Sequence, residues 1–511
     1  MVVQTELVAA PARAIPRRHA EAAILGALLL AAAVLRLMSL LALPSINWGD
    51  EVFQATEQAH RLVYGTGLVP WEFQLGIRSW ILPGIVAGLM EAARLLGDGP
   101  DYYMPVIDAA FATLAVAPVA CCYAWCRRSF GVPAAAIGAL FVVIAPELVY
   151  FGARTLMDVV AGHLLVIAVY VVDPGKPIAS RRRAFTGGLL LGLLFLLRIQ
   201  LAPMLGLIGV WLLWRFPRAQ RGALIAGAML AVLVIAVIDT ATLGSPLVSV
   251  WRYVWYNVFD GVSSTFGTEP WNFYLLGERE LWRGSLGAML ALTLLGAWRH
   301  PRLLVYALAI VATHSLIAHK EYRFIYPAIV LTSVLAGIGV AQLSVWASDW
   351  LRTKGVVPIP AVALPAVAIV ACGSVLMFEV WSGPTMTALR YRDHDMLEAI
   401  GYVRQETQLC GLGLYGGDGK DWVESGGYSY LHRAVPIYWP KDDAEFAATR
   451  SSFDTLIYTK TPPAESGFVS QQCFGSACVA QRPGRCESAP MMSMPFPPPI
   501  ARLAPADAAR R

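Results

Sequence analysis

Long runs of apolar residues, separated by short basic or polar segments, occupy the chain from about residue 21 to about residue 381. A helix of about 20 apolar residues crosses the roughly 30 Å hydrocarbon core of a bilayer, and within lipid a helix satisfies its own backbone hydrogen bonds. The pattern predicts a polytopic α-helical membrane protein. We expect about eleven spans, near residues 21–43, 102–126, 132–150, 156–173, 185–201, 202–214, 222–243, 284–298, 302–318, 324–346 and 357–381.

The sequence beyond these spans has a different character. Residues 382–511 are polar and are interrupted by Gly and Pro, which predicts a small α/β-like soluble domain. The glycine-rich stretch "GLGLYGGDG" at 411–419 is not a phosphate-binding loop, because no Gly-Lys-Ser/Thr follows it. We therefore expect three parts: an N-terminal segment over residues 1–20, a transmembrane domain over 21–381 and a C-terminal domain over 382–511.

Composition supports the membrane assignment. The 511 residues are 57% hydrophobic and 15% charged, with a mean hydropathy of +0.56, which excludes an ordinary soluble globular protein. Many basic residues of this chain, whose net charge is +5, gather in clusters beside the spans. Membrane lipids are therefore expected around the protein, and no nucleic-acid partner is expected.

The positions of Lys and Arg predict the orientation, because basic loops stay on the cytoplasmic side. One side of the membrane accommodates all six clusters: Arg13/Arg17/Arg18, Arg127/Arg128, Lys176/Arg181/Arg182/Arg183, Arg215/Arg218/Arg221, Arg299/Arg302 and Arg352/Lys354. The N-terminus is then cytoplasmic and residues 382–511 lie outside. Residues 83–96 are apolar but short, so we expect a re-entrant or interfacial helix. If they span instead, every later side assignment reverses.

Four of the eight cysteines lie in the C-terminal part: Cys410, Cys473, Cys478 and Cys486. An even number of cysteines in an exported segment permits disulfides, although the sequence does not determine the pairing. The alternative is four unpaired thiols in a cytoplasmic tail. No histidines accompany them at zinc-site spacing, and we expect no metal or other cofactor.

The polar residues outside the basic clusters converge on the outer face under this topology. They come from residues 47–83, 146–158, the turn with Arg198 and Gln200, 244–282 and "HKEYRF" at 319–324. Charged groups within a membrane bundle are costly, so their convergence predicts a functional site.

The segment "LIAHKEYRFIYPAIV", residues 316–330, is the most informative of these. On a helix with 100° per residue, His319, Lys320 and Arg323 share one side, whereas Glu321 points elsewhere. Such a group of cations is suited to binding phosphate, with Arg as a bidentate donor. The alternative is that Lys320 and Arg323 extend into the lipid headgroups.

These residues also carry a family resemblance. "HKEYRFIYP" resembles the His-Lys-Glu-x-Arg-Phe signature of glycosyltransferase family 22, the glycosylphosphatidylinositol and asparagine-linked-glycan mannosyltransferases of the GT-C superfamily. Other landmarks follow the family's order: "DEVFQATEQAHRLVYGTGL", "GIRSWILP", "ARTLMD", "LLRIQLAP", "DTATLGSPL" and "YNVFDGVSSTFGTEPWNFY". The resemblance covers roughly residues 40–330, and "NWGDE" departs from the His-Pro-Asp-Glu common in eukaryotic members. It implies a GT-C-like bundle with residues 21–381 as the catalytic domain.

The resemblance also implies an activity: transfer of a mannosyl residue from a polyprenyl-phosphate-mannose donor to a glycan or lipid acceptor, outside the cytoplasm. The location would be the periplasmic face of a bacterial inner membrane, or the lumen of the endoplasmic reticulum in a eukaryote. An inverting displacement needs a base and, across the anomeric carbon, cations for the leaving phosphate. We expect Asp50 as the base and the cations His319, Lys320, Arg323 and Arg198 at the donor phosphate.

Glu51 is the second carboxylate of the catalytic pair, and its side chain diverges from that of Asp50 by 100° on a helix. We expect it to orient the loop or to pair with Arg78. An alternative for Asp50 is that it only caps the helix that follows it.

Weaker substrate-binding candidates are Arg78, Arg154, Asp158, Trp271 and Tyr274. Arg154 and Asp158, at positions i and i+4, are equally consistent with a helix salt bridge. The two aromatic residues suit either a sugar or an interfacial aromatic belt. A lipid-linked sugar flippase, and a membrane-anchored binding protein acting through residues 382–511, remain alternative functions.

Overall fold

The computed structural model describes residues 17–173, 180–354, 363–463, 466–488, 490, 492 and 494–503. Within these ranges, an apolar helix corresponds to each expected span. They are α1 (Arg17–Leu41), α6 (Pro100–Leu114) with α7 (Ala117–Phe130), α8 (Val132–Val143), α10 (Met157–Val172), α11 (Arg181–Leu197), α12 (Ala202–Arg215), α13 (Arg218–Leu243), α16 (Leu286–Ala297), α17 (Pro301–Ser315), α18 (Tyr326–Thr353) and α19 (Ala363–Trp381). Arg13, Lys176, the start of the last expected span and most of the 1–20 segment lie outside the described residues.

The helices differ in length and burial. By length and composition, four helical stretches of the described chain can cross a membrane, or five when a bent pair near α19 counts as one. The apolar window of the stretch containing α18 is 94% buried, whereas those of α1 and α13 are 17% and 28% buried. The centre of the bundle is therefore α18, and α1 and α13 have broad apolar faces available for lipid. The predicted polytopic α-helical membrane fold is confirmed, although many of its helices are shorter than a full span.

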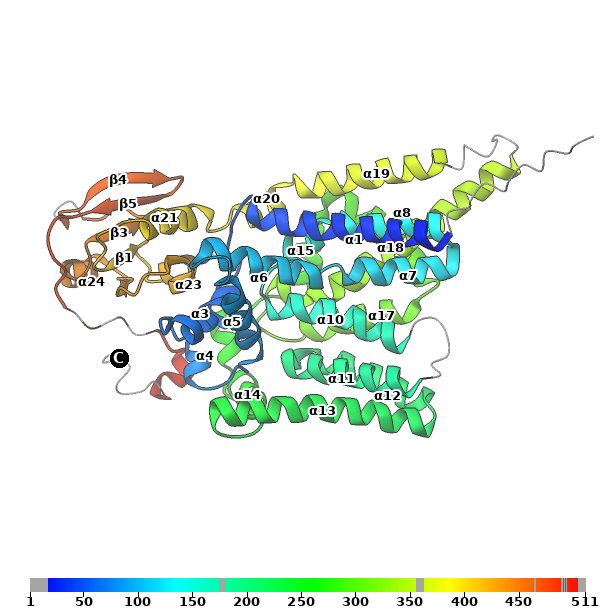
Figure 1. The fold of residues 1–511 in the computed structure, drawn as a ribbon, viewed down its shortest axis with the longest axis horizontal. Helices are drawn as coiled ribbons and strands as arrows, with labels where there is room; N and C mark the ends of the chain where they lie inside the picture. The colour runs from blue at the N-terminus through cyan, green and yellow to red at the C-terminus, as the bar shows by residue number, and fades with distance from the viewer. Residues whose placement is uncertain are drawn as a thin grey trace, which may run out of the picture.

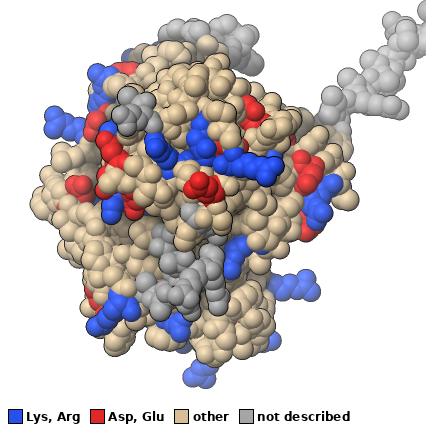
Figure 2. Space-filling model, turned by 90° about the vertical axis from the view of Figure 1, so that its left-hand side faces the viewer, with Lys and Arg blue, Asp and Glu red and all other residues tan. Residues whose placement is uncertain are grey.

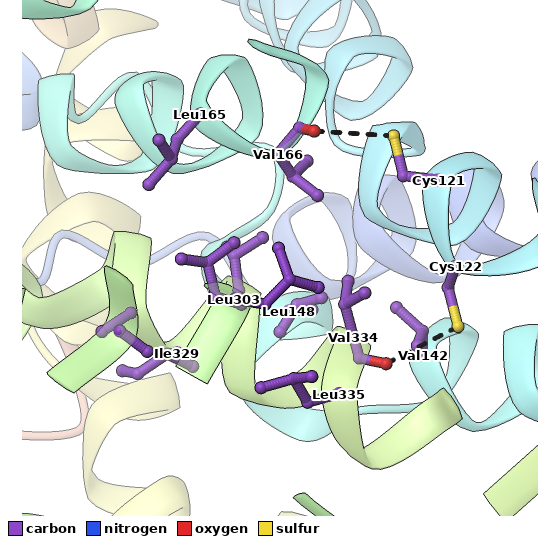
Figure 3. Packing of buried hydrophobic residues seen from close by; sticks show 14 of the residues in the cluster. Cys121, Cys122, Val142, Leu148, Leu165, Val166, Leu303, Ile329, Val334 and Leu335 are labelled. Atoms are coloured by element: carbon purple, nitrogen blue, oxygen red, sulfur yellow. Dashed lines mark hydrogen bonds between the residues drawn. The ribbon is translucent and has the colours of Figure 1, made fainter. Parts of the chain in front are cut away.

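Close helix packing builds the bundle around α18. Gly138 of α8 and Gly337 of α18 face each other so closely that a Cβ at either would overlap the other's carbonyl oxygen. Small residues allow this approach, which provides dispersion contacts that lipid tails alone do not. In the core beside them, the Cys122 thiol donates to the Val334 carbonyl and the Cys121 thiol donates to that of Val166 (Figure 3).

Short helices connect or follow the spans, and they gather at the end of the bundle that lies beside the C-terminal sheet (Figure 1). They are α2 (Gly49–Glu51), α3 (Glu57–Tyr64), α4 (Trp71–Gln74), α5 (Ile81–Ala93), α9 (Pro146–Phe151), α14 (Val248–Val254), α15 (Phe273–Trp282) and α20 (Pro384–Tyr391). Helix α5 covers most of the 83–96 segment and packs on α3 and α6. The turns α7–α8 and α12–α13, where basic clusters fall, lie at the opposite end.

The C-terminal unit, residues 392–503, contains a five-stranded mixed sheet in the order β2-β1-β3-β5-β4. Strands β1 (Leu412–Tyr415), β2 (Ile437–Tyr438) and β3 (Thr455–Tyr458) are parallel, and β4 (Val469–Phe474) and β5 (Ala477–Gln481) pair antiparallel. The accompanying helices are α21 (His394–Arg404), α22 (Asp421–Glu424), α23 (Gly427–Leu431) and α24 (Asp443–Thr449). The α/β character predicted for this region is confirmed, and Figure 2 shows that its end of the molecule carries both acidic and basic side chains.

Two disulfides join the four cysteines of the C-terminal unit, Cys410 to Cys486 and Cys473 to Cys478. The first encloses the sheet between residues 76 positions apart, and the second closes the β4–β5 hairpin. The other cysteines, Cys121, Cys122, Cys126 and Cys372, are free.

We expect this thiol pattern to be measurable. Alkylation of the unfolded, unreduced protein should modify the four free cysteines, and all 8 should react after reduction. Intact-mass spectrometry counts the adducts. Modification of all cysteines without reduction would contradict the disulfides and would favour a reducing compartment for the C-terminal unit.

Candidate active site

A cavity of about 710 Å³ lies where several segments between the spans meet. Residues from the first outer loop expected from the sequence (47–83), the α11–α12 turn, the α14 region and the 316–324 segment line it. The ionisable residues in its lining are Asp50, Glu72, Arg78, Arg198, His319, Glu321 and Arg323. The structure thus brings together five of the eleven residues that the sequence analysis selected: Asp50, Arg78, Arg198, His319 and Arg323.

Arg323 is the central residue of the wall and is only 4% exposed. Its Nη2 lies 2.6 Å from Oδ2 of Asp50, and its Nε lies 2.6 Å from Oε2 of Glu321. Its Nη1 lies 3.4 Å from Oδ2 of Asp158. One guanidinium therefore joins the first outer loop, the start of α10 and its own segment. A buried side chain held in this way does not extend into the headgroup layer.

The 319–323 segment is not an α-helix, so the prediction about its faces is wrong. Helix α17 ends at Ser315, and only the short 3₁₀ turn η6 (Tyr322–Ile325) precedes α18. Glu321 therefore reaches both neighbours that were expected to face away from it: its Oε1 is 3.1 Å from Nε2 of His319 and its Oε2 contacts Arg323. The reason is that extended and 3₁₀ backbone does not place residues at 100° intervals.

Lys320 has a structural environment instead of a place in the cavity lining. Its Nζ donates to the carbonyls of Glu269 at 2.7 Å and Ile317 at 2.5 Å. The backbone N–H of Glu269 also donates to the Ala318 carbonyl. Together these bonds fasten the loop before α15 to the signature segment, which we define as residues 318–324.

Asp50 and Glu51 diverge, as predicted, and face different cavities. Asp50 lines the 710 Å³ cavity, and Glu51 lines a second cavity of about 380 Å³ between the bundle and the C-terminal unit. The expected Glu51–Arg78 pair is wrong, because Glu51 accepts from Arg154 Nη1 at 3.0 Å. Glu51 also accepts from the backbone N–H of Asn47 at 2.6 Å, so it does orient the loop.

Asp158 pairs with arginines that are distant in sequence. Its Oδ1 lies 2.5 Å from Arg198 Nη2 and its Oδ2 faces Arg323, so the Arg154–Asp158 helix salt bridge, one of the two alternatives for this spacing, is wrong. The reason is local: α9 ends at Phe151 and α10 begins at Met157, which leaves both partners without a common helix.

Asp50 is not a helix cap. The residue at the N-cap of α2 is Trp48, and Asp50 makes no capping hydrogen bond there. The side chain instead reaches Arg323, which supports a role in the cavity over the capping alternative.

Arg78 differs from the other arginines of the site. Its guanidinium carbon lies 5.3 Å from the centre of the Tyr253 ring, and Arg78 has no ion-pair partner among the described residues. Its buried Nε also lacks a hydrogen-bond partner there. Arg78 is thus the cation of the lining that remains available for an anion.

Glu72 is a site residue that sequence reasoning missed, although it lies in the same polar loop as Asp50. Its Oε1 accepts from Nε2 of Gln54 at 3.2 Å. Burial and the charge of Asp50 raise its pKa to about 7, against the opposing effect of Arg78. At neutral pH this carboxyl therefore exchanges a proton readily.

Glu321 and His319 have pKa values shifted in opposite directions, down for the carboxyl and up for the imidazole. Burial opposes ionisation of Glu321, but the charge of Arg323 and hydrogen bonds from His319 and Arg323 outweigh it and lower the pKa to about 2. Burial likewise disfavours the charged form of His319, but its bonds to Glu321 and the Gly267 carbonyl raise its pKa. His319 thus becomes a cation more readily than an ordinary histidine.

The two aromatic candidates are not in the cavity lining. Trp271 is 69% exposed, as in an interfacial belt, and Tyr274 is buried. The aromatic side chains that line the cavity are Trp71, Tyr253, Phe266 and Phe324. Their position depends on how the loops fold, and no sequence period marks it.

Comparisons with known proteins identify a family. The model of a family described as the Alg9-like mannosyltransferase family matches residues 27–432. GPI mannosyltransferase 3 of Yarrowia lipolytica is 30% identical over 430 residues, which are 83% of this chain and 78% of that protein. GPI alpha-1,2-mannosyltransferase 3 of Danio rerio is 27% identical over 309 residues, which are 58% of this chain and 56% of that protein.

Solved structures show the same fold. ArnT from Cupriavidus metallidurans in the apo state superposes with a TM-score of 0.58 at 15% identity, covering 91% of this chain and 98% of that one. The same protein bound to undecaprenyl phosphate gives a TM-score of 0.55 at 13% identity, with the same coverage. The predicted GT-C-like bundle is confirmed by this likeness.

We expect Glu72 to make stability depend on pH. Its pKa rises from 4.5 to about 7 on folding, so its contribution is fully present below pH 4.5 and is lost as pH rises through about 7. The melting temperature of the wild-type protein should therefore fall relative to that of Glu72→Gln between about pH 5 and about pH 8. Differential scanning fluorimetry in detergent measures both curves, and parallel curves would contradict the assignment.

Proposed function

Because the chain belongs to the Alg9-like mannosyltransferase family, we propose that it transfers a mannosyl residue, with inversion, from polyprenyl-phosphate-mannose to a glycan or lipid acceptor. The observation that carries the proposal is the pair of the buried Arg323 with the half-buried Asp50 in the wall of the 710 Å³ cavity. It places a carboxylate in a fixed position beside a space large enough for a sugar and part of its carrier.

The cavity lining suits a lipid-linked donor. Apolar side chains make one part of it, among them Ile199, Val254, Val258, Leu316 and Ile317. Gln200, Asn257, Ser263 and Ser264 provide polar partners for sugar hydroxyls. The solved ArnT structure with undecaprenyl phosphate shows that a protein of this fold binds a polyprenyl phosphate.

Charge decides where the donor phosphate binds. In and behind the wall, Arg78, Arg198 and Arg323 face four carboxylates, those of Asp50, Glu72, Asp158 and Glu321. A proton on Glu72 balances these charges, and a proton on His319 adds a positive one. The site then accepts an anion. We assign the phosphate to Arg78, with Arg198 as a further donor. His319, whose two ring nitrogens face the Gly267 carbonyl and Glu321, contributes its charge.

This assignment changes the role expected for Arg323. The sequence-based mechanism put the base and Arg323 on opposite sides of the anomeric carbon, but the two side chains are in contact, so no sugar lies between them. Arg323 instead holds Asp50 in place. Lys320, bonded to carbonyls, stabilises the segment that carries Arg323 and His319.

The reaction then needs one displacement. Asp50 takes the proton of an acceptor hydroxyl, whose oxygen attacks the anomeric carbon while the bond from that carbon to the phosphate oxygen breaks. The phosphate keeps the electron pair and is stabilised by Arg78 and His319. Attack opposite the leaving group inverts the centre, so a β-linked donor gives an α-linked product.

The location follows from the same proposal. We place the site on the periplasmic face of a bacterial inner membrane, or on the lumenal face in a eukaryote, with residues 21–381 as the catalytic membrane domain and 382–511 outside. The two disulfides support this side, because they persist in oxidising compartments. Transfer of labelled mannose by purified protein separates this function from a flippase, which moves its substrate without forming a new glycosidic bond.

We expect Asp50→Asn to abolish transfer without loss of folding or donor binding. The amide cannot accept the hydroxyl proton, and loss of a general base costs about 10²–10⁴-fold in rate. Arg323 keeps Glu321 and Asp158 as partners. Incorporation of labelled mannose and binding of polyprenyl-phosphate-mannose measure the two effects.

Glu51→Gln is the matched control for this prediction. It removes a charge from the buried pair with Arg154, so it should lower the melting temperature. The rate of transfer per folded molecule should stay unchanged. Full activity of Asp50→Asn, together with an inactive but folded Glu51→Gln, would move the base to Glu51.

Arg323→Lys should lower kcat by about one to two decades. The compact ammonium group of lysine lacks the planar guanidinium fork, so it cannot bind Asp50, Glu321 and Asp158 together. Donor affinity should change little, since Arg78 binds the phosphate. Steady-state kinetics distinguish the two parameters. A large rise in donor KM with normal kcat would return Arg323 to the phosphate site.

A further inference from the structure

The residues around Asp50 are held from two directions. On the bundle side, Arg323 binds the Asp50 carboxylate and Arg154 binds that of Glu51. On the other side, the C-terminal unit contacts the catalytic turn, which we define as residues 44–57. Figure 1 shows the C-terminal sheet and helices beside this end of the bundle.

Val423 of α22 packs directly on the residue before Asp50. A Cβ built on Gly49 would lie 2.7 Å from Cγ1 of Val423, which is closer than carbon atoms approach. Gly49 does not have a positive φ, so the backbone conformation does not call for glycine here. The small space beside Val423 does. The position of α22 therefore limits the position of the Asp50 backbone.

Apolar contacts extend this packing along the turn. Phe53 and Trp422 meet edge to face, with ring centres 4.9 Å apart. Leu397 of α21 packs in one cluster with Ile46 and Val52. Residues on both sides of Asp50 thus bury apolar surface against the C-terminal unit.

Glu57 fastens the end of the turn. It is fully buried, and its Oε1 accepts from the backbone N–H groups of Leu68 at 2.7 Å and Tyr428 at 3.1 Å. Its Oε2 accepts from the N–H of Ser429 at 2.8 Å. Burial raises the pKa of this carboxyl to about 7, although the three backbone bonds favour its ionised form. They join α3 to α23.

Polar contacts also hold the beginning of the turn. Nδ1 of His394 lies 2.7 Å from the Pro44 carbonyl oxygen, and Nη1 of Arg392 donates to Oδ1 of Asn47 at 3.4 Å. Asn47 in turn donates its backbone N–H to Glu51. A continuous set of contacts therefore connects the C-terminal unit to the backbone on either side of the base.

We propose that the C-terminal unit is a working part of the active site, and that Val423 and Trp422 are positioning residues that set where Asp50 stands in the cavity. This inference rests on the proposed function. A misplacement of about 1 Å at a reacting group costs about 10²-fold in rate, so contacts that fix the turn control kcat.

The C-terminal unit has a hydrophobic core of its own in addition to its contacts with the turn. Its sheet is built on a separate core that includes Leu412, Ile457 and Val479, and one disulfide encloses it. A small displacement of α22 should therefore affect the base without unfolding the unit.

A pair of variants at the contact tests the proposal. Gly49→Ala introduces a methyl group against Val423, and should lower kcat by about 10-fold or more with donor KM and melting temperature nearly unchanged. Val423→Ala alone should lower kcat only a few-fold. The double variant makes room for the new methyl group, and should recover kcat to within about threefold of the wild type.

Gly88→Ala is the matched control, because a Cβ at this exposed helical glycine of α5 meets no atom within 4 Å. It should leave all parameters unchanged. A normal kcat in Gly49→Ala, or a double variant no better than Gly49→Ala, would overturn the positioning role. Absence of mannosyl transfer in the wild-type protein would overturn the proposed function itself, so the two failures are distinguishable.

Discussion

A buried positive charge in the wall of the cavity is the constraint on which the rest of this structure depends. Arg323 is only 4% exposed, and an unpaired buried charge costs several kcal/mol. Its guanidinium therefore needs carboxylate partners. Three carboxylates from separate segments meet it: Asp50, Asp158 and Glu321. Their convergence brings the first outer loop, α10 and the segment before α18 to one place. The second buried pair, Arg154 with Glu51, then anchors the neighbouring residue of the same turn.

The cations of the site differ in whether they already have binding partners within the protein. Arg323 and Arg198 are occupied by carboxylates, and Lys320 by backbone carbonyls. Arg78 has no carboxylate partner among the described residues, and His319 has a raised pKa. Arg78 is therefore the guanidinium of the described lining that is free of a carboxylate, whereas both ring nitrogens of His319 already face acceptors. The same principle explains why the most conspicuous motif of the sequence is largely structural.

The C-terminal unit completes the arrangement from the opposite side. Buried apolar contacts at Gly49 and Phe53, and the bonds made by Glu57, connect it to the turn that carries Asp50. Dispersion contacts depend steeply on distance, so a close-packed joint transmits small shifts. Asp50 is thus located by the membrane bundle and by the C-terminal unit together, although only the first is marked by long hydrophobic runs.

The sequence by itself determined the membrane bundle, the α/β character of the C-terminal unit and most of the ionisable residues of the cavity. Hydrophobic runs and buried charges follow general energetic rules that need no coordinates. It did not determine the partners. Glu51 with Arg154, and Asp158 with Arg198, pair across distances of 103 residues and across two helices, respectively. The helical angles failed at Glu321 because the segment is not α-helical, and Glu72 escaped notice because its pKa depends on burial and on Asp50. Only the tertiary structure decides these features, because the energy of a charge is set by its neighbours in space and not by its neighbours along the chain.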